Sequence, residues 1–511
     1  LVQDGKIIAN FATDVNPNQV VPKQIQSLTG ISNTQVQKAP YFEDVAHTIY
    51  HYLEDTIFVA HNVHFDYNFL ARELVRCGTP PLTIPAIDTV ELAQIFLPTE
   101  KSFRLSDLSE SLGLSHENPH QADSDAQVTA ELLLLIQEKM KSLPLVTMEK
   151  IAELSQQTAR ETSTFIQQTY EQMKKQVTPL NPAYQVVSGI ALRKKEVPLF
   201  EETFYQTSTY PKTKKAKEKL FGERFAYRAE QSRMMNLVYH HFTEGTTKDL
   251  FIEAATGTGK TLGYLLPMSY LATPEKPVII STVSIVLQNQ LVEKDLPLAN
   301  QICQGKLRGI VIKSHRHYLD LQRFKATLNQ PTPQKQYALY QMGVLVWLLE
   351  TETGDLDELQ LTNLNHLFWK EVTHRGLDFL SKKDELYEVD FLRHLYKKVA
   401  QSNVLIVNHA FLAQESLRKQ PLLPESPWLI IDEAHHLPDI ASRMASERVN
   451  SVILKKQVTH FIEKEQLFVA LQQIFQQFSE EQRLVKIYQQ GLLDFVDEWQ
   501  DFRSEEHTSE L

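Results

Sequence analysis

Short apolar runs alternate with amphipathic and charged stretches along the chain, and this pattern predicts an α/β fold. In the first 140 residues, β-rich runs such as KIIANFA and TIFVAHN alternate with amphipathic sequence such as VTAELLLLIQEKM. From about residue 225, the runs DLFIEAA, PVIISTV, NVLIVNH and WLIIDEA are β-branched and almost uncharged. Such runs are typical of buried strands in a parallel sheet. We therefore expect two α/β units.

The sequence around these units has other patterns. Polar helical sequence without Gly or Pro, from Met148 to Lys175, predicts a connecting helix. Residues 183–224 predict a strand pair followed by the basic run KTKKAKEK, which we expect to be an exposed boundary. Leu-rich, charged sequence between about His315 and Ser402 interrupts the second unit and is interpreted as an insertion. The predicted domains are 1–140, 141–224, 225–436 and 437–502.

Composition excludes several classes of protein. Hydrophobic residues make up 42% of the chain, enough for packed cores, and the two cysteines, Cys77 and Cys303, are too few for a disulfide framework or a four-cysteine metal site. No apolar run reaches the roughly 18 residues that span a bilayer. The start of the chain has no export pattern. We expect a cytoplasmic protein without membrane contact.

The net charge of −11 comes mainly from residues 1–140, which hold 8 Lys and Arg against 18 Asp and Glu. Clustered carboxylates either bind a divalent cation or form a solvated acidic surface. Only their spacing distinguishes the two interpretations.

The sequence AATGTGKT predicts a phosphate-binding loop in strand, loop, helix order. Gly257 and Gly259 let backbone N–H groups turn toward phosphates, and the following helix adds its positive end. Lys260 would bind the β and γ phosphates, and Thr261 would offer its hydroxyl to Mg²⁺. The strict pattern begins with Gly, where this chain has Ala254. The expected nucleotide-binding residues of the loop are Ala254, Ala255, Thr256, Gly257, Thr258, Gly259, Lys260 and Thr261.

The run WLIIDEAHH predicts the metal side of the same site. Asp432 ends an apolar strand and would hold Mg²⁺ through water, while Glu433 would polarise the attacking water. His435 would relay the state of the nucleotide to the nucleic-acid side. An acidic pair after a strand is also a common helix cap. The upstream loop favours the nucleotide interpretation.

Five ordered motifs carry a family resemblance. YRAEQ with Arg228, ATGTGKT, STVSIVLQNQL at 281–291, VNHAFL at 407–412 and DEAH resemble the DinG and XPD-like group of superfamily 2 DNA helicases. The resemblance implies a RecA-like lobe over 225–436, an arch-like insertion starting within 437–502, and a second lobe beyond.

Three further roles are implied by the same resemblance. Gln231 would contact adenine, and Ser281 and Thr282 would lie near the bound strand. An ordinary turn at a strand end is the alternative for Ser281 and Thr282.

Iron–sulfur members of that group have a cysteine after a Lys-Gly-Arg-x-Asn-Tyr pattern. The matching stretch here is KSHRHYLD, with Asp320 in that place, and no cysteine follows Cys303. Because a cluster needs thiolate ligands, we expect no iron–sulfur cluster. His315 and His317 are interpreted as nucleic-acid-facing or surface residues rather than metal ligands.

The front unit resembles DnaQ-like 3′-to-5′ exonucleases of the His-containing type, which implies an RNase H-like fold. HNVHFD with Asp66 resembles the second motif, IDTVELA with Asp88 fits between, and ENPHQADSDAQ with His120 and Asp125 resembles the third. In this family carboxylates hold two ions, Mg²⁺ or Mn²⁺, and a histidine takes the proton of water. Asp66 and Asp125 would be metal ligands and His120 the base. A helix cap or surface histidine is the alternative for His120.

The first motif of that family, an Asp-x-Glu on the first strand, is not in this sequence. LVQDGKIIANF resembles the second strand, and Asp4 belongs to an Asp-Gly turn. We expect the first strand and two more carboxylates before Leu1. The residues RSEEHTSEL (503–511) resemble a translated sequencing adapter and are expected to be an artefact. We therefore expect residues 1–511 alone to bind metal weakly and to have almost no exonuclease, ATPase or unwinding activity.

The leading hypothesis is a bifunctional DNA-processing enzyme. A metal-dependent 3′-to-5′ exonuclease would be coupled to an ATP-dependent helicase acting on single-stranded or tailed DNA. The alternatives are an ATP-gated nuclease or binding module without unwinding, and an ATPase that serves a partner other than nucleic acid. The run KTKKAKEK would either contact backbone phosphates or form a solvated linker.

Overall fold

The computed structural model describes most of the chain up to residue 445 and four short pieces beyond. The described ranges are 1–116, 121–176, 179–196, 209–223, 225–245, 249–255, 257–303, 307–330, 334–360, 366–418, 422–445, 483–484, 486–488, 490–491 and 494. They fall into two compact units, Leu1–Asn408 with Pro424–Ile430 and His409–Leu423 with Ile431–Leu511. None of the described helices is long and apolar enough to cross a bilayer. His120, Thr256 and most of the predicted 437–502 segment lie outside the described residues.

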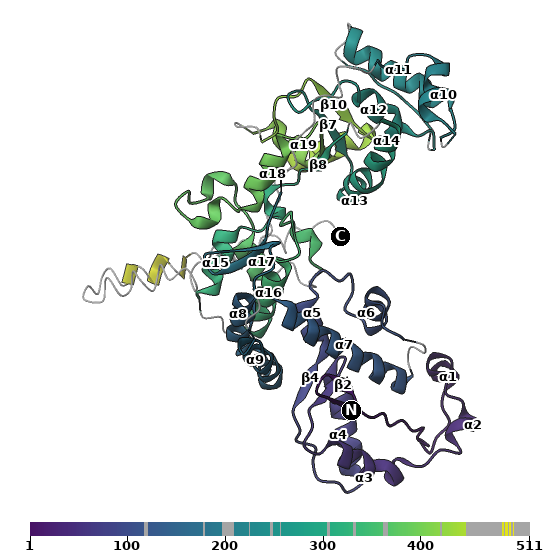
Figure 1. The fold of residues 1–511 in the computed structure, drawn as a ribbon, viewed down its shortest axis with the longest axis vertical. Coiled ribbons are helices and arrows are strands. Elements are labelled where there is room, and N and C mark those ends of the chain that lie inside the picture. The colour runs from purple at the N-terminus through teal and green to yellow at the C-terminus, as the bar shows by residue number, and fades with distance from the viewer. Residues whose placement is uncertain are drawn as a thin grey trace. The chain divides into compact units, whose positions relative to one another are not determined.

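The front part of the first unit packs helices around short strands (Figure 1). Its elements are β1 (Val2–Gln3), β2 (Lys6–Ile7), α1 (Lys23–Thr29), α2 (Asn33–Val36), α3 (Phe42–Leu53), β3 (Phe58–Ala60), α4 (Val63–Arg76), β4 (Ala86–Asp88), α5 (Thr89–Phe96), α6 (Leu105–Leu112) and α7 (Ala122–Ser142). Strands β3 and β4 are parallel, and β1 and β2 form an antiparallel hairpin. Its turn residues Asp4 and Gly5 have φ of 49° and 76°, as the predicted Asp-Gly turn requires.

The connecting region differs from the single helix predicted for 148–175. It contains α8 (Leu145–Ser155) and α9 (Arg160–Lys174), which pack on each other, and then the antiparallel pair β5 (Tyr184–Val187) and β6 (Ile190–Arg193). Because the chain breaks between the two helices, α9 folds back on α8 and Ile166 of α9 is buried. In one continuous helix, α9 would not pack on α8.

The basic run forms part of α10 (Lys214–Phe221), and its predicted exposure is wrong at Lys217. This side chain is fully buried, and its Nζ donates to the Pro211 carbonyl at 2.8 Å and to Asn236 on α11 (Ala229–Glu244). Helix formation turns this one position of the run toward α11, where two oxygen acceptors compensate for burying the amine.

A four-stranded sheet organises the second α/β part. Its strands are β7 (Val278–Thr282), β8 (Gly309–Val311), β9 (Val404–Asn408) and β10 (Trp428–Ile431), in the order β10-β7-β9-β8. Strand β9 is parallel to both β7 and β8. Its helices include α12 (Lys260–Met268), α13 (Ile285–Gln290) and α14 (Leu296–Cys303). The predicted strands PVIISTV, NVLIVNH and WLIIDEA and the α/β fold class are confirmed.

The fourth predicted strand, DLFIEAA, does not form. Residues 249–255 have no strand, and Phe251 is 91% exposed. Both sides of β7 and of β9 already have partners, so no central position is left for this segment. The run is apolar enough for a buried strand. Whether it forms one also depends on a free strand edge with which it can pair.

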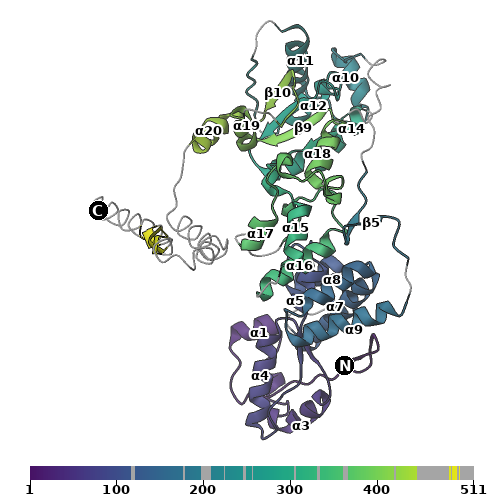
Figure 2. The same ribbon diagram turned by 90° about the vertical axis from the view of Figure 1, so that its left-hand side faces the viewer.

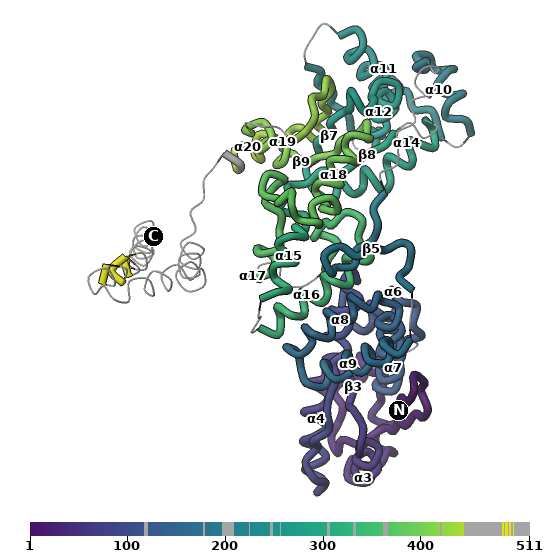
Figure 3. Tube along the Cα trace, turned by 60° about the vertical axis from the view of Figure 1, so that its left-hand side comes forward, coloured from purple at the N-terminus to yellow at the C-terminus, as the bar shows by residue number. Residues whose placement is uncertain are grey.

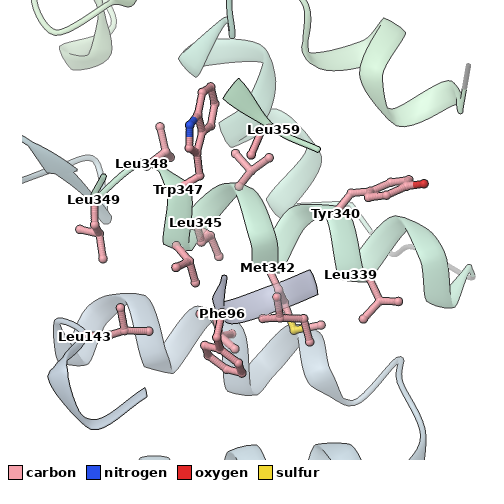
Figure 4. Close-up of a cluster of buried hydrophobic side chains, with 14 of the residues drawn as sticks. Phe96, Leu143, Leu339, Tyr340, Met342, Leu345, Trp347, Leu348, Leu349 and Leu359 are labelled. Carbon is pink, nitrogen blue, oxygen red and sulfur yellow. The ribbon is translucent and has the colours of Figure 1, made fainter. Parts of the chain in front are cut away.

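The insertion is helical, as predicted, and it shares a core with the front part. Its helices are α15 (Leu321–Leu328), α16 (Lys335–Trp347), α17 (Leu367–Val372) and α18 (Phe391–Val399). Every residue of α16 from Tyr337 to Trp347 is buried, and this helix packs against α5 and α8 (Figure 2). Figure 3 shows α16 beside α8 from another side. Figure 4 shows Phe96 of α5 facing Met342 and Leu345 of α16. One hydrophobic core therefore joins the front part, the connecting helices and the insertion.

The second unit holds α19 (His409–Ser416), a short turn at Ala434–His436 and α20 (Leu437–Ala445).

Candidate nuclease and nucleotide sites

Two predicted metal ligands, Asp66 and Asp125, lie near enough in the front part for the charge of Asp125 to affect Asp66. Asp66 lies in the first turn of α4 and Asp125 in the first turn of α7, where the positive helix end favours a carboxylate. Desolvation by the surrounding protein raises the pKa of Asp66, and the negative charges of Asp125 and Asp88 raise it further. Carboxylates that repel each other in this way are the arrangement that a bound divalent cation relieves.

Asp88 fixes the backbone beside this pair. Its carboxylate caps α5 through the Val90 N–H at 2.9 Å and also accepts the Asn62 N–H at 3.0 Å and the Val63 N–H at 3.3 Å. Asn62 has φ of 72°, a left-handed conformation that a non-glycine residue adopts only when its surroundings hold it. Asp88 thereby ties the start of α5 to the start of α4, the helix that carries Asp66.

His116 is a site residue that the sequence interpretation missed. Its Nε2 lies 2.8 Å from Oδ1 of Asp125, its Nδ1 lies 3.1 Å from Oγ of Ser109, and its side chain is only 7% exposed. The available signal was a second histidine in SHENPH, four residues before His120. Since His120 lies outside the described residues, its predicted role as the base stays a prediction.

His61, in the HNVHFD motif, is not available as a base. Its Nε2 lies 2.8 Å from the Phe103 carbonyl, and its Nδ1 lies 3.0 Å from Oγ1 of Thr89. Burial lowers its pKa, so the neutral ring is favoured. Both ring nitrogens serve to hold the loop after β3.

The phosphate loop has the backbone that its glycines predict. Gly257 and Gly259 have φ of 81° and 80°, and Gly259 is the N-cap of α12, which starts at Lys260. Arg228 donates from Nη1 to the Gly257 carbonyl at 2.8 Å, and Gln231 donates from Nε2 to the Gly259 carbonyl at 3.0 Å. Arg228, the N-cap of α11, and Gln231, in the first turn of α11, therefore hold the loop from one side.

Close packing also restricts the loop. A Cβ added at Gly259 would lie 2.1 Å from Nε2 of Gln231, a distance that requires movement. Within the loop, the Thr258 hydroxyl donates to the Ala255 carbonyl at 2.8 Å. The predicted contact of Gln231 with adenine stays a prediction, since its amide here holds the loop carbonyl. Ala254 and Thr261 lie at the two ends of this loop, as predicted from sequence.

The DEAH motif meets the VNHAFL motif in the second unit. His409 is fully buried, and burial lowers its pKa, while hydrogen bonds to the backbone of Asp432 and Glu433 act in the opposite direction. Glu433 has φ of 53°, a strained conformation that costs of order 1–3 kcal/mol and occurs mostly at functional sites. His435 lies with Nδ1 3.6 Å from Oε2 of Glu433. His409 is a further residue that the sequence interpretation did not single out.

Ser281 and Thr282 end strand β7 with both side chains buried, at 0% and 1% exposure. The Thr282 hydroxyl donates to the Ser284 carbonyl at 3.2 Å, as in a strand-end turn. Their contact with a bound strand stays a prediction, and in this conformation neither side chain faces solvent.

One group of side chains in the insertion has the spacing of a metal site. Ligand atoms of His317, Asp355 and Asp357 lie within 4.8 Å of one another. However, Lys313 places its ammonium on both carboxylates, at 2.8 Å from Oδ2 of Asp357. Hydrogen bonds from His317 and Lys313 hold the pKa of Asp357 well below its usual range. The lysine already supplies the positive charge at this place.

The chain was compared with protein families and with known proteins. Residues 1–133 match a family model described as Exonuclease. A 3′-5′ exonuclease DinG of Bacillus subtilis (strain 168) is 33% identical over 488 residues, which are 94% of this chain and 52% of that protein. The protein of the same name from Staphylococcus aureus (strain USA300) is 31% identical over 481 residues, which are 93% and 52% of the two chains. The chain thus spans about half the length of these curated relatives.

A solved structure, exonuclease X in complex with 5′ overhanging duplex DNA, is 29% identical over 27% of this chain and 78% of that chain, with a TM-score of 0.22. The two sequence relatives match more than nine tenths of the chain, and the family match covers its first 133 residues. They confirm the resemblance predicted from the motifs: the chain is of the DinG type and carries an exonuclease domain in its first 133 residues.

Proposed function

We propose that the protein is a metal-dependent 3′-to-5′ exonuclease coupled to an ATP-dependent DinG-type helicase that acts on DNA. The observation that carries the proposal is that Asp66 and Asp125, in the first turns of separate helices, interact electrostatically inside the region that matches the exonuclease family. Two carboxylates that repel each other raise the free energy of the folded protein. A bound cation between them would remove that repulsion.

The described residues fit a divalent metal such as Mg²⁺ or Mn²⁺. Asp66 and Asp125 offer the hard oxygen ligands that these ions prefer. When bound, the ions supply a Lewis acid that lowers the pKa of water and stabilises the leaving oxygen of a phosphodiester. His116 orients the Asp125 carboxylate through its 2.8 Å contact. We assign to His120 the role of the base that accepts a proton from the attacking water.

The nucleotide half of the proposal rests on the braced loop. Backbone N–H groups at the start of α12 and the ammonium of Lys260 would bind the phosphates of ATP. Thr261 and Asp432 would hold Mg²⁺, and Glu433 would orient the attacking water. The loop backbone requires no rearrangement at Gly257 and Gly259, since both already have positive φ. No iron–sulfur cluster is needed in this scheme.

The common core gives the coupling a physical basis. Because α16 of the insertion packs on α5 of the front part, a displacement of the insertion also changes the packing around α5. Asp88, the cap of α5, holds the start of the helix that carries Asp66. If binding of DNA or nucleotide shifts the insertion, the shift would thus be transmitted to the nuclease carboxylates through direct contacts.

The test uses protein expressed from the complete gene and a 5′-labelled single strand with Mg²⁺. A ladder that shortens from the 3′ end, and that stops at a 3′ phosphorothioate linkage, supports the exonuclease. Stimulation of ATP hydrolysis by the same strand supports the helicase-type ATPase, and release of a labelled duplex partner supports unwinding. Endonucleolytic fragments, or ATP hydrolysis that DNA leaves unchanged, would contradict the respective half of the proposal.

A further inference from the structure

A surface pocket of about 340 Å³ lies between the start of α10 and one face of α11. The lining residues on α11 recur at three- and four-residue intervals from Ala229 to His240, so they form a single face of the helix. Figure 1 shows the two helices side by side, and a hydrogen bond from Lys217 of α10 to Asn236 of α11 joins them. The pocket belongs to the first compact unit, and none of the residues assigned above to the nuclease or nucleotide sites lines it.

The pocket is lined by basic side chains and by no carboxylate. The basic residues of the lining are all exposed at the surface; they are Lys212, Lys214, Arg233 and His240. The two lysines and the arginine carry positive charge at neutral pH. Within the described part of the chain, no acidic side chain lies at ion-pair distance from Arg233. The net charge of the lining is therefore positive.

Two glutamates outside the lining offset only part of this charge. Glu244 lies 3.5 Å from Nζ of Lys212 and 3.3 Å from Nδ1 of His240. Glu218 lies 3.7 Å from Nζ of Lys214. The paired side chains are 46–68% exposed, so water screens these pairs and they stabilise the fold little. An anion that reaches the lysines would therefore replace weak contacts.

Hydrogen bonds around Asn236 hold the backbone of the basic segment in place. Its Nδ2 donates to the Lys212 carbonyl at 3.0 Å, and its Oδ1 accepts hydrogen bonds from the Tyr210 hydroxyl at 3.0 Å and from Lys217. The Thr213 side chain caps α10. The run KTKKAKEK is therefore folded against α11 rather than a loose linker. A ligand that binds side chains presented by a fixed backbone loses less conformational entropy.

Tyr227 adds an aromatic ring to the basic lining. Nζ of Lys214 lies 5.4 Å from the centroid of this ring, and Tyr227 is half-buried. Cationic side chains beside an aromatic ring are the combination with which proteins bind single-stranded nucleic acid, since the cations contact phosphates and the ring stacks on a base. A free phosphate compound would use only the cations.

We propose that this pocket binds one nucleotide unit of a single-stranded nucleic acid. Phosphates of the strand contact Lys212, Lys214 and Arg233, and a base stacks on Tyr227. The volume is at the lower end of the range for ligand pockets, about 300–1,000 Å³, which suits one unit of a strand that continues over the surface. The choice of a nucleic acid as ligand rests on the proposed function, whereas the site itself uses none of the nuclease or ATPase residues.

The helix that forms one side of the pocket also holds the phosphate loop. Arg228 at its N-cap and Gln231 in its first turn donate to loop carbonyls, and neither of them lines the pocket. A strand bound in the pocket would therefore contact the helix on which the loop rests.

Trace acylation of lysine amines, followed by peptide mass spectrometry, tests the proposal. Protein expressed from the complete gene is acylated alone, with a single-stranded oligothymidylate, and with inorganic pyrophosphate at the same phosphate concentration. ATP is left out, and a chelator prevents degradation of the strand. A phosphate beside an amine stabilises its protonated, unreactive form, so the oligothymidylate is expected to slow acylation of Lys212 and Lys214 at least about threefold. Lys219, an exposed residue of α10 outside the lining, is expected to react as in the free protein.

Charge removal with a matched control connects the protection to the pocket. Lys214→Gln/Arg233→Gln is expected to reduce the magnitude of the slope of log affinity against log salt by about 1.4, since each phosphate contact of a single strand contributes about 0.7. Lys215→Gln/Lys219→Gln removes the same charge from exposed positions outside the lining and is expected to leave the slope unchanged. Fluorescence anisotropy of a labelled oligothymidylate measures both. If the first variant melts at a lower temperature than the parent, Lys212→Gln/Lys214→Gln replaces it.

Substitution of Tyr227 separates stacking from charge. Tyr227→Ala is expected to weaken oligothymidylate binding at least about fivefold with the salt slope unchanged, since stacking on the ring releases no counterions. Tyr227→Phe, which keeps the ring, is expected to bind as the parent does.

Protection of Lys212 and Lys214 by the oligothymidylate, weakening as salt rises, supports the site. Equal protection by pyrophosphate would assign the pocket to free phosphate compounds and overturn the proposal of a strand. Absence of protection, or the same salt slope in the two folded double variants, would overturn it as well. The proposed function is tested separately. A protein that degrades DNA without protecting these lysines keeps its nuclease and loses this site, whereas protection in an inactive Asp66→Asn protein supports the site without the nuclease.

Discussion

Lys335 Nζ lies 2.7 Å from Oε2 of Glu91, so an ion pair joins the first turn of α16 to the first turn of α5. The Glu91 side chain is only 10% exposed, and the pair borders the hydrophobic core that these two helices share. The insertion thus contacts the helix whose cap, Asp88, holds the start of α4, the helix that carries Asp66.

Loss of packing in α16 is expected to weaken the front part as well as the insertion. Leu345→Ala should lower the free energy of unfolding by about 2–5 kcal/mol, because it leaves a cavity in a fully packed core. Amide hydrogen exchange should accelerate in α5 as well as in α16. Leu417→Ala, at a side chain 75% exposed, is the control and should change little. Unchanged exchange in α5 of the Leu345→Ala protein would show that the two parts are not coupled through this core.

Removal of His116 is expected to weaken metal binding through Asp125. His116→Ala should lower Mn²⁺ affinity about 10- to 100-fold, since partners of ligating carboxylates fix their orientation. Titration followed by electron paramagnetic resonance measures the free Mn²⁺. His51→Ala, at a side chain 84% exposed, should bind as the parent does. Equal affinities of the His116→Ala and parent proteins would contradict the positioning role.

The two loop glycines are expected to respond differently to a methyl group. Gly257→Ala meets nothing within 4 Å and bears only the strain of positive φ, about 1–2 kcal/mol, whereas Gly259→Ala also collides with Gln231. Fluorescence titration with a labelled ATP analogue should show the larger loss of affinity in Gly259→Ala. Adding Gln231→Ala should recover part of that loss by removing the clash. A larger loss in Gly257→Ala would contradict the bracing of the loop by Gln231.

The raised pKa of Asp66 predicts a pH dependence of stability without metal. The folded protein holds a proton on Asp66 more tightly than the unfolded chain, so this group favours folding at low pH. That contribution is lost as the pH rises from the ordinary value of about 3.9 through the raised pKa. With chelator present, Asp66→Asn should therefore raise the melting temperature at neutral pH, and the gain should vanish in acid. A lower melting temperature of Asp66→Asn at neutral pH would contradict the raised pKa of Asp66.

Much of the architecture was predictable because it depends on local pattern. The β-branched runs gave β7, β9 and β10, and the glycines of AATGTGKT gave a loop with positive φ at both expected positions. Asp66 and Asp125 were paired by motif resemblance, and the charge of Asp125 contributes to the raised pKa of Asp66; their role as metal ligands stays a prediction.

What escaped prediction depends on which segments meet. Helix α16 is apolar on all sides, so its sequence indicates burial without naming α5 and α8 as neighbours. His116 and His409 gain their roles from contacts with residues on other elements, and the sequence around each histidine does not name those partners. DLFIEAA was predicted as a strand from its composition, but β7 and β9 already had neighbours on both sides.

The most direct test of the proposed function compares three variants of the protein expressed from the complete gene, in one assay of 3′-end degradation with Mg²⁺. Asp66→Asn and Asp125→Asn are expected to lower the rate at least about 100-fold, since each removes a metal ligand, while Lys260→Ala keeps degradation without ATP near the parent rate. Parental rates in Asp66→Asn and Asp125→Asn proteins would contradict the assignment of the nuclease site.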